Sequence, residues 1–203
     1  MTARIKREFN FQTGVNFNNK FLVNAYEVVM YFNVETDSIY EQNIALERLK
    51  YFIHEILDNS VFINSDLSEI IQKYQDAELK LCTLPSDPYD QIIAIMLLVK
   101  ANSIMEDRII CTDISLTSAL SDDVHCLHSI EENTGVFSEN GWWNDSSPKF
   151  TNFKQKNKRQ KLVQLVKSVS SWEEVFLGWD QGVDNIEQSA EVVFVNFGKK
   201  SEI

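Results

Sequence analysis

The side chains best suited to bind a metal ion lie in one short stretch, where His125 and His128 flank Cys126. Imidazole and thiolate groups are the usual protein ligands of zinc. The segment is typical of a β-strand, however, and residues three positions apart on a strand point to opposite faces of the sheet. No matching pair of cysteine or histidine residues lies elsewhere at a fixed spacing, so ordinary strand positions are favoured over a zinc site.

The residues whose spacing would suit proton transfer are His54 and Asp58, because four positions on a helix bring two side chains to the same face. An isolated surface pair is the more ordinary interpretation, since no nucleophile motif such as Gly-x-Ser-x-Gly accompanies them. The six glycines are also too few and too dispersed for a loop that cradles phosphate. We therefore expect no catalytic residues, no metal and no cofactor.

Two adjacent tryptophans, Trp142 and Trp143, stand in the most loop-like part of the chain, after Gly141 and before Pro148. Indole rings are costly to expose, so two interpretations stay open. The rings either tuck a long loop back onto the body of the protein or present a contact surface to a partner. Large aromatic side chains are mostly buried, which favours tucking. The partner-binding hypothesis assigns the contact to this pair.

The charge of the chain argues against a generic nucleic-acid or membrane-surface protein. Thirty acidic and nineteen basic residues give a formal net charge of −11, which repels phosphate backbones and anionic lipids. The acidic residues are scattered, which indicates solubility rather than a mimic of DNA. A basic cluster between Lys154 and Lys161 could contact a phosphate or an acidic partner, but the solvated start of a helix is the simpler interpretation.

Cysteine content and hydropathy bear on the compartment. Cys82, Cys111 and Cys126 are an odd number without close pairing, which is not the pattern of a secreted disulfide framework. The N-terminal ten residues have basic side chains but no apolar run after them, and no apolar stretch approaches the roughly 18 residues of a membrane helix. We therefore expect a cytoplasmic protein without a signal peptide or a membrane span.

Among the elements that must position these residues, two strands come first. Apolar and polar residues alternate from Phe9 to Phe17, and residues 21–34 are rich in β-branched and aromatic side chains. Between them, Gly14 and the asparagines at 16, 18 and 19 can supply the positive φ angles of a hairpin turn.

Two long helices are predicted next. Apolar residues recur at three- and four-residue steps over 40–57, which indicates an amphipathic helix. A loop with one short helix near residues 68–74 is expected over 61–80. Asp87 as N-cap and Pro88 in the first turn then indicate the start of another helix. Its body, residues 92–99, is apolar on every side and should be the core helix.

The fold class follows from the remaining patterns. Residues 108–120 and 124–130 predict a second pair of strands, and residues 131–153 predict a loop excursion. We therefore predict a single α+β domain over residues 1–203, with a mainly antiparallel sheet packed against two long helices.

Residues 154–203 are expected to form a C-terminal extension with helices and a closing strand. The pattern indicates a helix over 154–168 and a strand over 191–197. Between them, Ser171 and Glu174 form a capping box, which indicates a short helix.

The order of these elements resembles the tunnelling fold, a family that includes 6-pyruvoyl-tetrahydropterin synthase and 6-carboxytetrahydropterin synthase. The likeness covers about residues 9–130 and is carried by layout: two strands, a long helix, a loop, an apolar helix and two strands. Leu57-Asp58-Asn59 stands where the family often has Leu-Asp-His, and the Pro-Ser-Asp-Pro sequence at 85–88 stands where it often has a Pro-Thr helix start.

The resemblance implies a ligand and an assembly. The family's enzymes hold zinc with three histidines from the first two strands, but residues 6–34 contain no histidine, so zinc chemistry does not carry over. The family anchors a pterin or purine-like ring with an acidic residue near the third strand, and Asp113 lies in a comparable place. Its members assemble as rings through sheet edges, which implies a homo-oligomer.

Three functional hypotheses follow from the sequence. The leading one is a non-catalytic or divergent α+β protein that acts by protein–protein interaction, with Trp142 and Trp143 at the contact. The alternative is a divergent tunnelling-fold protein that binds a pterin or purine-like molecule near Asp113. A regulatory contact with nucleic acid through residues 154–161 is the third and weakest.

Overall fold

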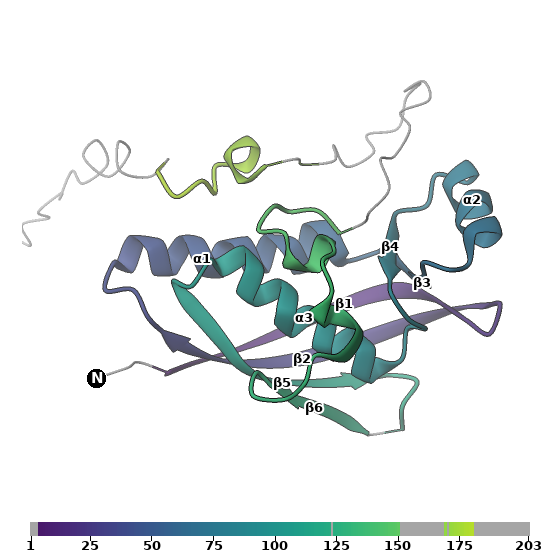
Figure 1. Ribbon diagram of the computed structural model, residues 1–203, viewed down its shortest axis with the longest axis horizontal. Helices are drawn as coiled ribbons and strands as arrows, with labels where there is room; N and C mark the ends of the chain where they lie inside the picture. The colour runs from purple at the N-terminus through teal and green to yellow at the C-terminus, as the bar shows by residue number, and fades with distance from the viewer. Residues whose placement is uncertain (1–3, 123, 151–168, 170, 181–203) are drawn as a thin grey trace, which may run out of the picture.

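The computed structural model describes residues 4–122, 124–150, 169 and 171–180 (Figure 1). The helix expected over residues 154–168, with its basic cluster, lies outside the described residues, and so does the strand expected over 191–197. The described part is a sheet with helices, which is the mixed α+β architecture that the sequence indicates.

The sheet has six strands in the order β4-β3-β1-β2-β5-β6. The pairs β1–β2, β2–β5 and β5–β6 are antiparallel, while β1–β3 and β3–β4 are parallel. The prediction of a mainly antiparallel sheet is therefore confirmed. The strands are β1 (Arg4–Phe17), β2 (Lys20–Val34), β3 (Val61–Asn64), β4 (Leu81–Leu84), β5 (Ile109–Ser118) and β6 (His125–Ser129).

The hairpin of β1 and β2 differs from the prediction at its tip. Asn18 and Asn19 make the turn, with φ angles of 49° and 59°. Gly14 does not lie in the turn, because it pairs with Val23 well inside the hairpin. A Cβ atom at this position would lie 2.6 Å from the ring of Phe21. Gly14 therefore lets the Phe21 ring lie across the strand, and a larger residue would displace that half-exposed ring.

Within the described residues, three α-helices accompany the sheet: α1 (Ile39–Tyr51), α2 (Ser68–Asp76) and α3 (Asp90–Met105). A π-helical turn, Phe52–Leu57, continues α1, so the helix expected over residues 40–57 is present in two parts. In this turn the amide of Asp58 donates to the carbonyl of Ile53, five residues earlier, at 2.9 Å. No helix of the described residues is long and apolar enough to span a membrane.

The beginning of α3 lies slightly later than the sequence indicates. Tyr89 occupies the N-cap position, and the Asp87 carboxylate accepts a hydrogen bond from the side-chain amide of Asn64 at 2.9 Å. Asp87 therefore fastens the loop before α3 to the end of β3 instead of capping the helix. Residues 93–98 are all buried, which confirms the core helix.

The segment 61–80 was expected to be a loop with one short helix, and only the helix, α2, is confirmed. The segment begins with β3, and β4 follows directly after it. Each of these strands is four residues long and buried on both faces or nearly so. A short parallel strand of this kind lacks the alternation that marks a strand in a sequence.

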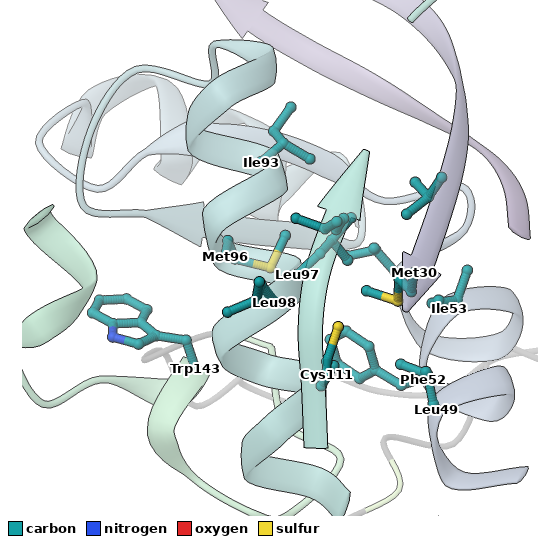
Figure 2. Packing of buried hydrophobic residues seen from close by; sticks show 14 of the residues in the cluster. Met30, Leu49, Phe52, Ile53, Ile93, Met96, Leu97, Leu98, Cys111 and Trp143 are labelled. Carbon is teal, nitrogen blue, oxygen red and sulfur yellow. The ribbon is translucent and has the colours of Figure 1, made fainter. Parts of the chain in front are cut away.

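The helices α1 and α3 cover one face of the sheet and enclose the main core (Figure 1). Figure 2 shows Leu49, Phe52 and Ile53 from the α1 side packed toward Met30 of β2 and Cys111 of β5. On the other face, a smaller apolar cluster lies between α2 and the strands β3 and β4. At the turn end of the β1–β2 hairpin, α2 also contacts this face, where the side-chain amide of Asn16 donates to the Tyr74 hydroxyl at 2.9 Å. No helix of the described residues lies over the rest of this face, from Lys6 to Gln12 of β1 and along β5 and β6.

Candidate functional site

The face of β1, β2, β5 and β6 away from α1 and α3, here called the open face, is the candidate site. Side chains alternate between the two faces of a strand, so the register defines its members. Two hollows lie on it, with volumes of about 500 Å³ and about 730 Å³. The open face carries Lys6, Glu8, Asn10, Gln12, Ala25, Glu27, Val29, Tyr31, Asp113, Ser115, Thr117, His125 and Leu127.

A β-bulge in β5 turns Asp113 toward the open face. The register between β2 and β5 shifts next to Tyr31, so that Thr112 is the extra residue and Asp113 pairs with Tyr31. Before the bulge, residues 109 and 111 face the core, whereas after it the even-numbered residues 114, 116 and 118 do. Without the extra residue, Asp113 would continue the buried series of Cys111. The bulge thus keeps a carboxylate out of the core and presents it on the surface.

The smaller hollow surrounds this carboxylate and is called the Asp113 hollow. Lys6, Tyr31 and Ser129 also line it. The Asp113 carboxylate has no hydrogen-bond or ion-pair partner among the described residues. The Tyr31 ring, on the directly opposite residue of β2, is 44% exposed. Lys6 pairs with Glu8, which raises the pKa of the lysine above its usual value.

The larger hollow reaches the edge of β1 at Asp58 and Asn59. One carboxylate oxygen of Asp58 accepts from the backbone amide of Gln12 at 2.7 Å, and the other accepts from the side-chain amide of Asn59 at 2.7 Å. Lys80 donates to the carbonyl of Asp58 at 2.9 Å. The Asp58 carboxylate is therefore engaged in holding the end of the π-helical turn against β1.

His54, four positions earlier, was the candidate partner of Asp58 for proton transfer, although an isolated surface pair was the favoured interpretation. The ring of His54 lies 6.0 Å from that of Phe9, between centroids, and no described contact joins it to Asp58. The geometry of the described residues does not assemble a proton-transfer pair here.

The histidines of β6 also stay apart. His125 is exposed and its Nδ1 lies 2.9 Å from the hydroxyl of Thr117, whereas His128 is buried and its Nδ1 lies 3.0 Å from a carboxylate oxygen of Glu132. The two rings thus lie on opposite faces, as their spacing indicates. The described residues contain no group of three or more His, Cys, Asp or Glu side chains placed to hold a metal ion.

Comparison with known proteins finds distant structural neighbours, two of which are described here. No family model and no curated protein matches the sequence. An uncharacterized protein from Wolinella succinogenes superposes with a TM-score of 0.48 and 15% identity, covering 64% of this chain and 99% of that one. A catalytic-residue mutant of the 6-pyruvoyltetrahydropterin synthase of Plasmodium vivax gives a TM-score of 0.36 and 11% identity, covering 63% and 97%. At these scores neither likeness carries an argument about this chain.

The layout on which the sequence resemblance rests is present in the chain itself. Two strands, α1, α3 and two further strands follow one another in that order, and the unit β3-α2-β4 occupies the place of the expected loop. The strands β1, β2, β5 and β6 are contiguous and antiparallel, with both helices on one face.

Trp142 and Trp143 adopt the tucked arrangement. They are 3% and 5% exposed. The Trp142 indole donates to the carbonyl of Thr83 at 2.8 Å, and the Trp143 indole donates to the carbonyl of Phe137 at 3.1 Å. Both rings belong to the core in this arrangement, and Figure 2 shows Trp143 among the core side chains.

Two buried cations were not identified from the sequence. Arg48 and Lys100 are 1% and 0% exposed, although each lies on a helix where a charged residue would normally mark the solvent side. Their partners are carbonyls and carboxylates from distant segments, which the sequence does not place. The one available signal is that Lys100 directly follows the all-apolar run of residues 92–99.

Proposed function

We propose that the chain works as a binding protein and that the Asp113 hollow takes a small planar nitrogen heterocycle of the pterin or purine kind. The observation that carries the proposal is the free carboxylate of Asp113 on the open face, turned there by the bulge and set opposite an exposed tyrosine ring. The bulge brings the carboxylate to the surface with its two oxygens free of partners among the described residues, and this favours a ligand that donates hydrogen bonds.

The chemistry of these groups defines the ligand. An ionised carboxylate only accepts hydrogen bonds, and its two oxygens match two neighbouring N–H donors, such as an amino group beside a ring N–H. The exposed ring of Tyr31 offers an aromatic surface against which a planar ring can pack. Both features favour an amino-substituted heterocycle over an anion or a fatty acid.

Thermal denaturation with a panel of soluble pterins and purine nucleosides tests the proposal. A compound that binds only the folded chain raises its melting temperature by mass action. We expect at least one compound to do so, and we expect Asp113→Asn to remove the shift, because the amide replaces one acceptor with a donor. Glu27→Gln, an equivalent change elsewhere on the open face, should keep it. If no compound shifts the wild type, or if Asp113→Asn responds equally, the proposal fails.

A second proposal is self-association through the edges of the sheet, which is the form of protein contact that the geometry favours. The outer edge of β1 from Arg4 to Phe11 and the outer edge of β6 have no neighbouring strand among the described residues. Unpaired strand edges present N–H and C=O groups that another strand can satisfy. The partner we propose is a second copy of the chain, and a one-chain mass by light scattering at micromolar concentration would contradict this.

A further inference from the structure

Residues 171–180, here called the C-terminal strap, return to the body of the protein and lie along α1 (Figure 1). Within the strap, Trp172–Val175 forms a 3-10 turn, and the amide of Leu177 donates to the carbonyl of Trp172 at 2.9 Å. The strap thus carries its own local turn, and side chains of α1 hold this turn in place.

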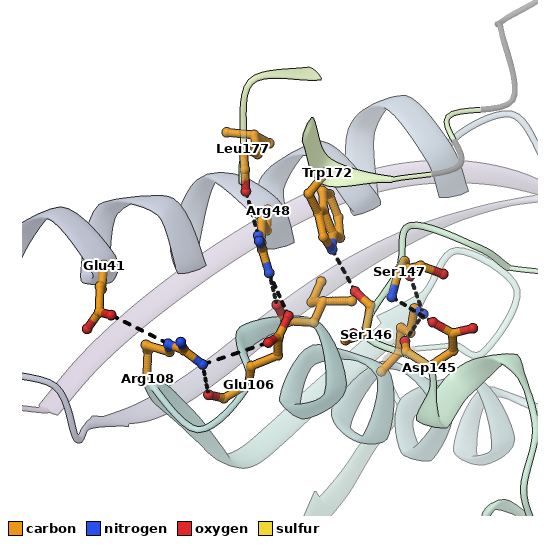
Figure 3. Close-up of polar contacts among 11 residues, drawn as sticks. Glu41, Arg48, Glu106, Arg108, Asp145, Ser146, Ser147, Trp172 and Leu177 are labelled. Atoms are coloured by element: carbon orange, nitrogen blue, oxygen red, sulfur yellow. Dashed lines mark hydrogen bonds and ion pairs between the residues drawn. The ribbon is translucent and has the colours of Figure 1, made fainter. Parts of the chain in front are cut away.

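The fastening centres on Arg48 of α1 (Figure 3). Its Nε donates to the carbonyl of Leu177 at 2.7 Å, and its Nη1 donates to a carboxylate oxygen of Glu106 at 2.8 Å. The guanidinium carbon lies 5.2 Å from the ring centroid of Trp172 and 3.7 Å from that of Trp179. One buried cation therefore contacts the strap through a carbonyl and two indole rings.

The two tryptophans make further contacts with the body. The Trp172 indole donates to the carbonyl of Ser146 at 2.6 Å, and its ring meets Tyr51 edge-on at 6.3 Å. The ring of Trp179 also lies 4.3 Å from the guanidinium of Arg108, which is paired with Glu106. The receiving surface, here called the Arg48 groove, is built by α1, the end of α3 and the 145–147 loop. Its two guanidinium groups, paired with Glu41 and Glu106, fit aromatic side chains.

One aromatic residue of the strap does not take part. Phe176 is 81% exposed and has a φ angle of 60°, so its ring points away from the groove. The strap therefore docks through Trp172 and Trp179, with Val175 and Leu177 also packed against the core, and it presents Phe176 outward. Peptide interfaces commonly depend on a few large side chains of this kind, here two tryptophans that contact one arginine.

We propose that the Arg48 groove is a peptide-binding site and that its ligand is the strap itself, a short acidic segment with tryptophans seven positions apart. The docked strap leaves and returns as a unit, because a few anchor side chains hold it and its own turn is local. The groove then accepts the same segment supplied as a separate peptide. This inference is independent of the Asp113 hollow.

The test uses the full chain and a labelled peptide with the sequence of residues 171–180. In wild type the tethered strap competes at high effective concentration, so added peptide should bind weakly. In the Trp172→Ala, Trp179→Ala double variant the groove is unoccupied, and we expect the peptide to bind roughly tenfold more tightly or better, as measured by fluorescence anisotropy.

Two controls make the result specific. Adding Arg48→Met to the double variant should abolish peptide binding. The second control changes only the peptide, so it holds even if the Arg48→Met protein does not fold: a peptide with Trp179→Ala should fail to bind the double variant. A peptide with Phe176→Ala should bind as well as the native one. Absence of peptide binding to a double variant with wild-type circular dichroism would overturn the proposal, as would equal binding of the native and Trp179→Ala peptides.

Discussion

At the scale of single residues, Lys100 shows how a buried charge organises a loop. Its Nζ donates to the carbonyls of Trp142, Asp145 and Ser147 at 3.0, 2.6 and 2.8 Å. Three acceptors match the three N–H donors of an ammonium group. Burial lowers the pKa of Lys100 to about 7, and the carboxylate of Asp145 partly opposes that shift. The tryptophan loop is therefore held by one cation beneath it.

Replacing this cation should loosen the loop and destabilise the fold. Lys100→Met keeps much of the side-chain volume but leaves three carbonyls without a donor, and we expect a loss of about 3 kcal/mol, on the order of one per carbonyl. Urea unfolding followed by tryptophan fluorescence measures it. Lys50→Met, on the exposed side of α1, should change stability by less than about 0.5 kcal/mol. Equal effects of the two changes would contradict the role given to Lys100.

The difference in unfolding free energy between Lys100→Met and the wild type should depend on pH. Because the pKa of Lys100 is about 7 in the folded chain and 10.5 in the unfolded chain, the unfolded chain binds more protons between these values. The lowered pKa of Lys100 therefore makes the wild type more stable as pH rises from 7 toward 10.5, by at most about 1.4 kcal/mol per pH unit, because the folded chain releases the proton first. Lys100→Met should lack this contribution, so the gap in unfolding free energy between the two proteins should widen over that range.

At the scale of elements, the sequence predicts the helices whose burial leaves a periodic pattern, and it misses features that depend on contacts between distant segments. The amphipathic pattern over 40–57 and the apolar run over 92–99 identify α1 and α3, because burial of one face or of all faces leaves a pattern. β3 and β4 are missed, since four-residue strands are too short for a pattern. Gly14 is misassigned to the turn, because the sequence does not show that Phe21 packs across it.

In the candidate site and the strap, too, the sequence indicates some residues but not the contacts that position them. Asp113 was singled out through the resemblance, but the bulge at Thr112 that turns it outward leaves only a change of parity in the apolar residues of β5. The docking of Trp172 and Trp179 onto Arg48 joins segments more than 120 positions apart. Contacts of this length are set by the assembled core and have no local signal.

The edge of β1 can be tested as an element because its backbone directions are known. The amide of Gly14 donates outward to Ser60, and that of Gln12 donates outward to Asp58, so the amides of even-numbered residues face away from β2. Glu8→Pro should therefore remove an outward donor while sparing the β1–β2 ladder. We expect this variant to fold and to lose self-association by light scattering.

Glu8→Ala is the matched control for the edge, because it also removes the pair with Lys6 but keeps the backbone amide. It should self-associate like the wild type. The edge proposal would be rejected if Glu8→Pro retained the wild-type mass.

At the scale of the whole molecule, the helices divide the sheet into a covered face and an open one. α1 and α3 enclose the core on one side, and the C-terminal strap lies along α1. The open face carries both hollows. The net charge of −11 disfavours an anionic ligand on this face, but a neutral or cationic heterocycle meets no such barrier.

The most direct test of the Asp113 hollow is amide NMR of the isotope-labelled chain during titration with a pterin or purine from the thermal panel. We expect the shift changes to cluster at Lys6, Tyr31, Asp113 and Ser129, and to disappear in Asp113→Asn. Shift changes confined to α1, α3 or the strap, or no change at saturating compound, would contradict the account.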